Sequence, residues 1–160
     1  GNVVWERVLG DLTSYDWGNA VRETRDGGFI IVGEENHFSA GMLMDVQAIK
    51  TDAEGNEVWS QTYVAIDNGY YDYANAVYET DDGGYVIAGA SAAFLGGAEV
   101  ASLLQIDGEG HLIAARTFGG PDAYWGSALC AAPDGGYVLV GHTNAYGAGS
   151  YDVWMFKVSE

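Results

Sequence analysis

Aspartate residues at the same position of two similar segments are the first candidates for chemistry in this chain. Asp45 and Asp152 each begin a similar apolar segment, and carboxylates that converge on a common axis could bind a calcium ion. The middle copy of this segment has Val100 instead, and aspartate at the start of a strand also accepts hydrogen bonds from backbone N–H groups. Asp107 and Glu109 could bind calcium in the same way, although exposed turns carry such pairs for structural reasons. The sequence therefore favours capping roles, leaves calcium open and predicts no other cofactor.

Aromatic side chains beside carboxylates form a second candidate site. They fall in three corresponding loop segments, which should emerge on one face of the molecule. Aromatic rings pack on the C–H faces of sugars, while carboxylates accept hydrogen bonds from hydroxyl groups, so this pattern predicts a lectin-like surface with a glycan as partner. Trp17, Tyr73 and Trp125 recur at the same point of each copy and are expected to pack between sheets instead. The candidate ligand-binding residues are Tyr15, Asp16, Tyr70, Tyr71, Asp72 and Tyr124.

Histidine and cysteine supply neither a zinc site nor a nucleophile. His37, His111 and His142 have no spacing that would bring two of them onto one face, as a zinc site requires. Cys130, the single cysteine, has no regularly placed histidine and aspartate to activate it. Its position in an apolar run instead indicates a small buried residue. The sequence thus predicts a protein that is not an enzyme.

These residues are positioned by a repeat. The pattern Asp-Gly-Gly-aromatic begins at Asp26, Asp82 and Asp134, with a period of about 50 residues. Each complete period holds four runs rich in Val, Ile, Tyr and Trp and bounded by Gly and Asp, which indicates strands rather than helices. Asp-Gly-Gly between two runs is a hairpin signal, because glycine adopts the positive φ of a tight turn. The sequence predicts an all-β chain with one domain, 1–160, and three repeats at approximately 1–54, 55–109 and 110–160.

Four-stranded antiparallel repeats of this length are typical of β-propellers, in which sheets stack around an axis. Residues 2–9 resemble the fourth strand of a preceding repeat, and the last repeat has only three strands. About four to eight sheets are needed to close a ring, so three should leave apolar faces and strand edges exposed. We expect completion by strand exchange with other copies, a six-bladed dimer being favoured; an open filament and a fragment of a longer propeller are the alternatives. The expected assembly residues are Val3, Val4, Trp5, Val153, Trp154 and Phe156.

The composition narrows the range of partners. The chain has six Lys and Arg against 23 Asp and Glu, a net charge of −17, and so lacks the basic stripes that bind nucleic acid. The same charge disfavours anionic membrane surfaces, and no apolar run approaches the roughly 18 residues of a membrane-spanning helix, so no membrane insertion is expected. Strong acidity suits an extracellular or salt-tolerant protein that its charge keeps soluble, and we expect an extracellular or cell-surface location.

The order of motifs in the repeat resembles that of a known kind of protein repeat. Its elements are Gly-Asn-x-x-Trp, then Phe-Gly-Gly, an Ala-Val run, Asp-Gly-Gly-Tyr-Val-Ile-Ala-Gly and Asp-Val-Trp-x-x-Lys. This order is similar to the propeller repeats of secreted and surface-anchored bacterial and archaeal proteins. The resemblance implies a propeller and an extracellular location but no particular activity, because propellers host many. The repeat is also, more distantly, similar to those of quinone-cofactor dehydrogenase propellers. This chain lacks their eight blades and the residues that hold their cofactor. We therefore predict a non-catalytic, self-assembling extracellular module, with a lectin-like module or a filament-forming subunit as alternatives.

Overall fold

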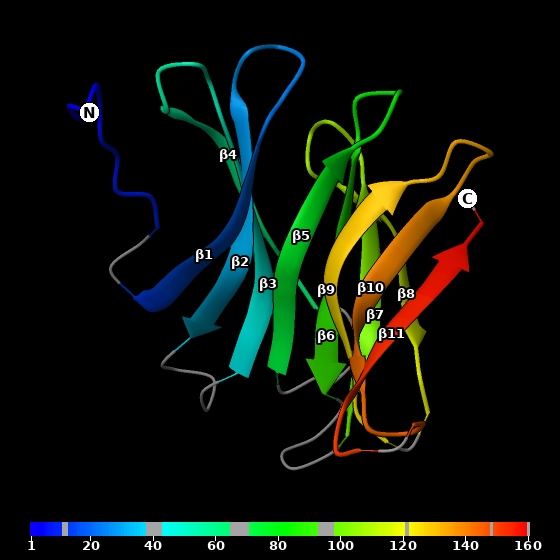
Figure 1. Cartoon of the computed structure of the whole chain (residues 1–160). Helices are drawn as coiled ribbons and strands as arrows, with labels where there is room; N and C mark the ends of the chain where they lie inside the picture. Colours follow the sequence, from blue (N-terminus) through cyan, green and yellow to red (C-terminus); the bar gives the residue numbers. More distant parts are fainter. Residues whose placement is uncertain are drawn as a thin grey trace.

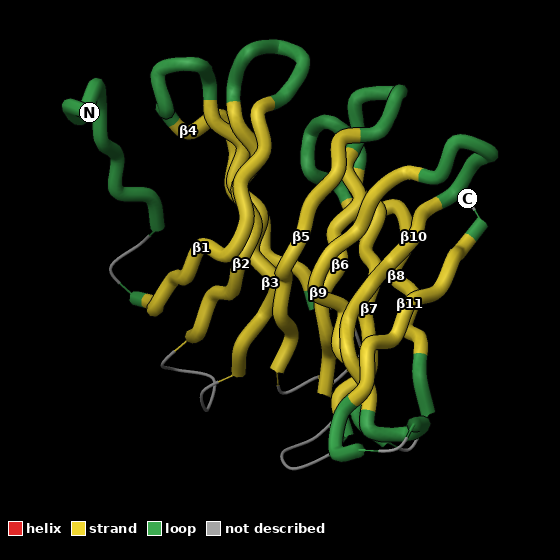
Figure 2. Tube along the Cα trace, viewed as in Figure 1, coloured by secondary structure: helices red, strands yellow, loops and turns green. Residues whose placement is uncertain are grey.

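The chain folds into β-structure. The computed structural model describes residues 1–10, 13–37, 43–64, 71–92, 98–120, 122–147 and 149–159, which contain eleven strands and no helix (Figures 1 and 2). Within these residues there is accordingly no helix that could cross a membrane. The predicted all-β class is confirmed. The strands are β1 (Ser14–Glu23), β2 (Phe29–His37), β3 (Leu43–Thr51), β4 (Glu57–Tyr63), β5 (Tyr71–Glu79), β6 (Tyr85–Ala92), β7 (Glu99–Ile106), β8 (Leu112–Phe118), β9 (Tyr124–Ala131), β10 (Tyr137–Thr143) and β11 (Asp152–Val158).

The strands form three antiparallel meanders. β1 to β4 make the first sheet, β5 to β8 the second and β9 to β11 the third, and each strand pairs with the next one in its sheet. A single parallel bridge, between Met44 and Tyr71, links the first two sheets, so they remain separate meanders rather than one continuous surface. Figure 1 shows the second sheet between the other two. The described sheets do not close on themselves, so the first and third sheets form two open ends.

The Asp-Gly-Gly segments form hairpin turns, as the sequence predicts. In the first turn the Thr24 amide donates to the Gly28 carbonyl oxygen over 2.9 Å, and the Gly27 amide donates back to the Thr24 carbonyl oxygen over 2.8 Å. Gly27 has a φ of 84°, a left-handed conformation that a side chain would strain. Asp26 Oδ1 accepts the Gly28 N–H over 3.0 Å and so closes the turn. The turn that contains Asp82 has the same backbone bonds, so this local chemistry repeats along the chain.

A second glycine in each sheet lets the first two strands approach closely. Gly89 of β6 lies where the register with β5 shifts, and a Cβ on it would lie 1.7 Å from the Tyr73 carbonyl oxygen. Carbon and carbonyl oxygen normally meet at about 3.3 Å, so no other residue fits there. The three sheets share this geometry. The corresponding distances are 1.6 Å for Gly33 to the Trp17 oxygen and 1.5 Å for Gly141 to the Trp125 oxygen.

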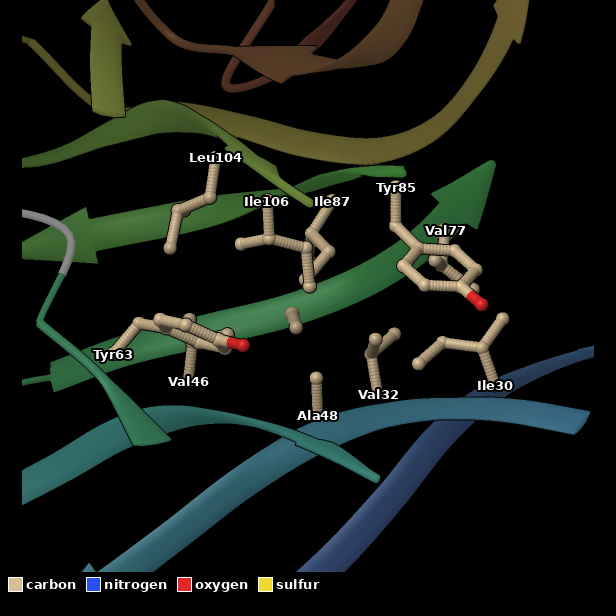
Figure 3. Close-up of a cluster of buried hydrophobic side chains, with 11 residues drawn as sticks. Ile30, Val32, Val46, Ala48, Tyr63, Val77, Tyr85, Ile87, Leu104 and Ile106 are labelled. Atoms are coloured by element: carbon tan, nitrogen blue, oxygen red, sulfur yellow. The ribbon is translucent and has the colours of Figure 1, made fainter. Parts of the chain in front are cut away.

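Two clusters of buried side chains hold the three sheets together. β6 contributes to both clusters, and all of its residues are buried. Burying one Ile- or Leu-sized side chain stabilises the fold by about 1.5–3 kcal/mol, so these clusters fix the order of the sheets. In the first cluster (Figure 3), Ile30, Val32, Val46, Ala48 and Tyr63 of the first sheet face Val77, Tyr85, Ile87, Leu104 and Ile106 of the second. The second cluster joins Val86, Ala88 and Leu103 of the second sheet to Leu139 and Val158 of the third.

Residues 1–9, the N-terminal segment, lie beside the first sheet and form no strand (Figure 1). The strand predicted at residues 2–9 is therefore wrong for the single chain. A strand needs an edge to pair with, and the outer edge of β11 lies at the opposite end of the stack. As a result Val3, Val4 and Val8 are 77%, 92% and 95% exposed. The chain thus presents an apolar segment at one end and a three-stranded sheet at the other.

Candidate functional site

The outer face of the third sheet is apolar and open to solvent. Val153 and Met155 of β11 are 83% and 69% exposed, while Phe156 and Val158, which alternate with them, pack on the second sheet. The cross-strand register puts Cys130 of β9 on the same outer face, where it is exposed. The predicted burial of Cys130 is therefore wrong, because no described sheet covers this side of β9. An exposed apolar face on an edge strand favours association with another chain.

The N-terminal segment packs on part of the outer face of the first sheet, at the other end of the molecule. The Trp5 ring lies 6.0 Å from that of Phe29 in β2, centroid to centroid, at an angle of 58°. A Cβ on Gly55, in the turn between β3 and β4, would lie 2.8 Å from the Trp5 ring and 3.2 Å from Arg7 Cγ. Trp5 and Arg7 therefore rest on the first sheet and contact its turn directly.

The same contacts occur between the first and second sheets. Trp59 of β4 lies 6.2 Å from Tyr85 of β6, centroid to centroid, at an angle of 61°. A Cβ on Gly110, in the turn between β7 and β8, would lie 3.1 Å from the Trp59 ring and 3.0 Å from Gln61 Cγ. The N-terminal segment thus contacts the first sheet as β4 contacts the second.

The expected assembly residues do not all reach the two open ends. The Phe156 ring lies 5.0 Å from that of Phe118 in β8 and 4.1 Å from that of Trp154, so these rings pack inside the chain. The expected role of Trp154 and Phe156 is therefore corrected to internal packing, because alternate residues of a strand face opposite sides of a sheet. Met155, which the sequence did not single out, lies on the open face beside Val153. The residues that do reach the open ends are Val3, Val4, Trp5 and Val153.

Two of the candidate glycan-binding residues are buried. Tyr124 is 4% exposed, and its ring lies 4.9 Å from that of Trp154. Asp72 is fully buried and accepts a hydrogen bond from Ser91 Oγ. Neither side chain reaches a surface where a sugar could contact it, so both assignments are wrong. Both residues lie on the first strand of their sheet, and their partners belong to the same sheet: Ser91 lies on β6 and Trp154 on β11.

The other described glycan-binding candidates lie on the first strands of two sheets. Tyr15 of β1 is 57% exposed, and Asp16 beside it is half-buried and accepts a hydrogen bond from Gln47 Nε2 over 3.2 Å. Tyr71 belongs to the second sheet and is half-buried. Tyr70 lies outside the described residues. Of the candidates that the structure describes, Tyr15 has the most accessible ring.

Two of the equivalent aromatic residues wedge between sheets, as the sequence predicts. Tyr73 of β5 and Trp125 of β9 stack with their centroids 5.4 Å apart at 24°, and Trp125 also stacks on His142 at 5.6 Å and 14°. Such aromatic pairs add about 0.5–1.5 kcal/mol beyond the burial of their surface. Trp17, the corresponding residue of the first sheet, is 45% exposed. No described sheet precedes it to supply the ring that Tyr73 supplies to Trp125.

Asparagine side chains also link each sheet to the next. Asn19 Nδ2 donates to the Ala74 carbonyl oxygen over 3.0 Å and to Glu34 Oε1 over 2.7 Å. Asn75 Nδ2 donates to the Gly126 carbonyl oxygen over 2.9 Å, so the bond from one sheet to the next recurs. Burial raises the pKa of Glu34, although the hydrogen bond from Asn19 opposes that shift. These polar groups join sheets and have a structural role.

The candidate metal ligands lie at separate places in the single chain. Asp45 lies in the first sheet and Asp152 in the third, with the second sheet between them (Figure 1). Asp107, Glu109 and His111 converge, with potential ligand atoms within 4.8 Å of one another. Asp107 Oδ1, however, accepts the backbone N–H of His111 over 2.8 Å and that of Glu109 over 3.0 Å, and the His111 bond lowers the pKa of Asp107. The hydrogen bonds of an exposed turn thus explain this cluster.

Comparison with known proteins places the fold but assigns no family. No protein-family model and no curated protein matches the chain. A solved structure that is similar is a protein of unknown function from Bacteroides caccae, with a TM-score of 0.51 and 14% sequence identity. The similarity covers 98% of this chain and 49% of that protein, so the chain spans about half its length. At this identity the match shows a shared all-β fold and nothing about activity.

Proposed function

We propose that this protein is a non-catalytic, extracellular β-propeller module of three repeats that assembles with other copies of itself, two copies closing a six-bladed ring. One observation carries the proposal: the N-terminal segment contacts the first sheet as β4 contacts the second. An isolated strand is not stable, so this placement calls for the remaining strands of its sheet to come from elsewhere. The third sheet, with three described strands, is the matching acceptor.

Three repeats are too few for one copy to close a propeller ring. The chain aligns with 49% of the Bacteroides caccae protein, which is therefore about twice as long as the aligned part. Propellers have about four to eight blades, so six blades lie within this range and three do not. Two copies of this chain, each with three repeats, would supply the six blades.

The assembly is head-to-tail, because the open end of one copy contacts the opposite end of the next. Contacts of this kind close into a ring when the rotation between copies fits and extend into a filament when it does not. The filament is therefore the alternative assembly. The net charge of −17 supports an extracellular location, where it would keep free chains soluble.

Light scattering on the purified chain tests this proposal. We expect particles with twice the chain mass of 17.0 kDa. Val153→Asp should reduce the mass to that of one chain, because it would bury an unpaired carboxylate at the junction. Ile113→Asp is the matched control, since Ile113 is a 58% exposed residue of β8, away from the two open ends, and it should leave the mass unchanged. A single-chain mass for the unmodified protein at every concentration contradicts the proposal, and very large particles favour the filament.

A lectin-like function is the second proposal, and the exposed pair of Tyr15 and Trp17 supports it. Their rings lie 5.9 Å apart at 43°, and both are about half exposed. On a glycan array we expect binding that Tyr15→Ala abolishes and that Tyr146→Ala, at another exposed ring, retains. An array without signal contradicts this function and leaves the assembly proposal untouched.

A further inference from the structure

We infer that residues 3–9 of one copy pair antiparallel with β11 of the next copy in a single register, with Trp5 opposite Lys157 and Arg7 opposite Met155. The inference rests on the proposed self-assembly and adds the partner strand and its alignment. β3 and β4 supply the template, because they are a complete pair of the same two strands within this chain.

The Asp-Gly-Gly hairpins align β11 with β3. The residue that follows the turn lies opposite Thr51 in the first sheet and opposite Val158 in the third. One residue earlier, Lys157 therefore corresponds to Lys50, and two residues before that Met155 corresponds to Ala48.

The two lysines support this alignment independently. Lys50 Nζ lies 2.8 Å from Asp26 Oδ2, in the turn of its own sheet, and Lys157 forms the same ion pair with Asp134 in the corresponding turn. β11 is thus set in its sheet as β3 is. The difference is that β4 covers the outer edge of β3, whereas none of the described strands covers that of β11.

The N-terminal segment aligns with β4 in the same way. By its contacts with the following sheet, Trp5 corresponds to Trp59, which lies opposite Lys50. The counterpart of Lys50 in the third sheet is Lys157, so Trp5 should lie opposite Lys157. Two residues further along, Arg7 corresponds to Gln61, which lies opposite Ala48, so Arg7 should lie opposite Met155.

Side-chain directions agree with this register. Trp5 and Arg7 point toward the first sheet of their own chain and so lie on the face between copies. Met155 and Lys157 are exposed on the outer face of the third sheet, which would meet that first sheet. Residues opposite each other in an antiparallel pair point the same way, and a slip of one residue turns every side chain to the other face. A slip would therefore turn Trp5 away from the sheet on which it now rests.

The open faces carry the apolar side chains that this junction needs. Within the chain, the first sheet packs on the second through the residues of Figure 3. The residues of the third sheet at the positions of Ile30, Val32, Val46 and Ala48 are Val138, Val140, Val153 and Met155. The residues of the first sheet at the positions of Tyr85, Ile87 and Leu104 are Phe29, Ile31 and Ile49. A second copy of this chain therefore fits each open face in the way that one of its own sheets fits the next.

Cross-linking between separately prepared copies tests the register. In a Cys130→Ser background, copies with Arg7→Cys are mixed with copies with Met155→Cys, so only a link between chains can form. Both positions are exposed in the single chain, so the substitutions should not disturb folding. We expect a short bifunctional maleimide to give a two-chain product with this pair. The control mixture, Val8→Cys with Met155→Cys, places the thiols on opposite faces and should lose the product.

The outcomes separate the register from the assembly itself. Product from the Arg7 and Met155 pair and none from the control supports the inference. A two-copy mass by light scattering with no product, or with equal product from the control, overturns the register and leaves the assembly in place. A single-copy mass overturns both.

Discussion

Replacing Gly89 by alanine should be among the most damaging single substitutions in this chain. The new Cβ would lie 1.7 Å from the Tyr73 carbonyl oxygen, about 1.5 Å inside a normal carbon–oxygen contact, so β5 and β6 must part. Gly89 cannot retreat freely, because a Cβ on Gly126 of β9 would already lie 2.6 Å from its carbonyl oxygen. Overpacking of this kind costs about 1–3 kcal/mol, and each backbone hydrogen bond lost costs about 1 kcal/mol more. The expected loss is about 2–5 kcal/mol of unfolding free energy.

Urea unfolding followed by tryptophan fluorescence measures this loss. With a slope of about 2 kcal/mol per molar urea, the midpoint should fall by roughly 1–2.5 M. Gly149→Ala is the matched control, because a Cβ there has nothing within 4 Å, and its midpoint should stay within error of the unmodified protein. Gly33→Ala and Gly141→Ala should resemble Gly89→Ala. If Gly89→Ala unfolds like Gly149→Ala, the close strand approach at the register shift is refuted.

Three further predictions concern charge. Burial raises the pKa of Glu34, so its ionised form destabilises the fold once the pH rises through that raised pKa. Glu34→Gln should therefore raise the melting temperature at pH 7 but not at pH 4. An equal gain at both pH values contradicts ionisation of Glu34 as the cause. The hydrogen bond from Lys50 lowers the pKa of Asp26, which stabilises the fold above the ordinary aspartate pKa and is lost as pH falls below it. Asp26→Asn should therefore cost up to about 1 kcal/mol at pH 7 by urea unfolding and less toward pH 2, whereas a constant difference contradicts the ionic origin. Raising salt from about 0.01 to 0.15 M shortens the screening length from about 30 to 8 Å, so light scattering should show stronger assembly of chains that each carry −17; weaker assembly would point to attractive ion pairs at the junction.

The strands and turns followed from the sequence because their causes are local. Asp26-Gly27-Gly28 specifies a hairpin through one positive φ and one carboxylate that closes the turn. The period of these turns then fixes where each strand begins and ends. The continuous apolar character of β6 is typical of a strand covered on both faces, and all of its residues are buried.

The candidate sites were harder to predict because burial depends on neighbours distant in the chain. Tyr124 and Asp72 looked like exposed loop residues, yet both are buried, with partners on β11 and β6. In β11 every residue from Val153 to Phe156 is apolar, so the pattern could not tell the inner face from the outer one. A period-2 alternation of polar and apolar residues would have separated them.

The sequence alone determined that the chain is all-β, where its hairpins lie and that its two ends resemble parts of one sheet, since turn geometry and strand propensity act over a few neighbouring residues. Only the tertiary structure decided which side chains the second sheet covers and which remain on the open faces. It also decided that Trp5 and Arg7 already rest on the first sheet in the manner of β4. Contacts of that kind depend on how whole sheets stack, and no short stretch of sequence contains this information.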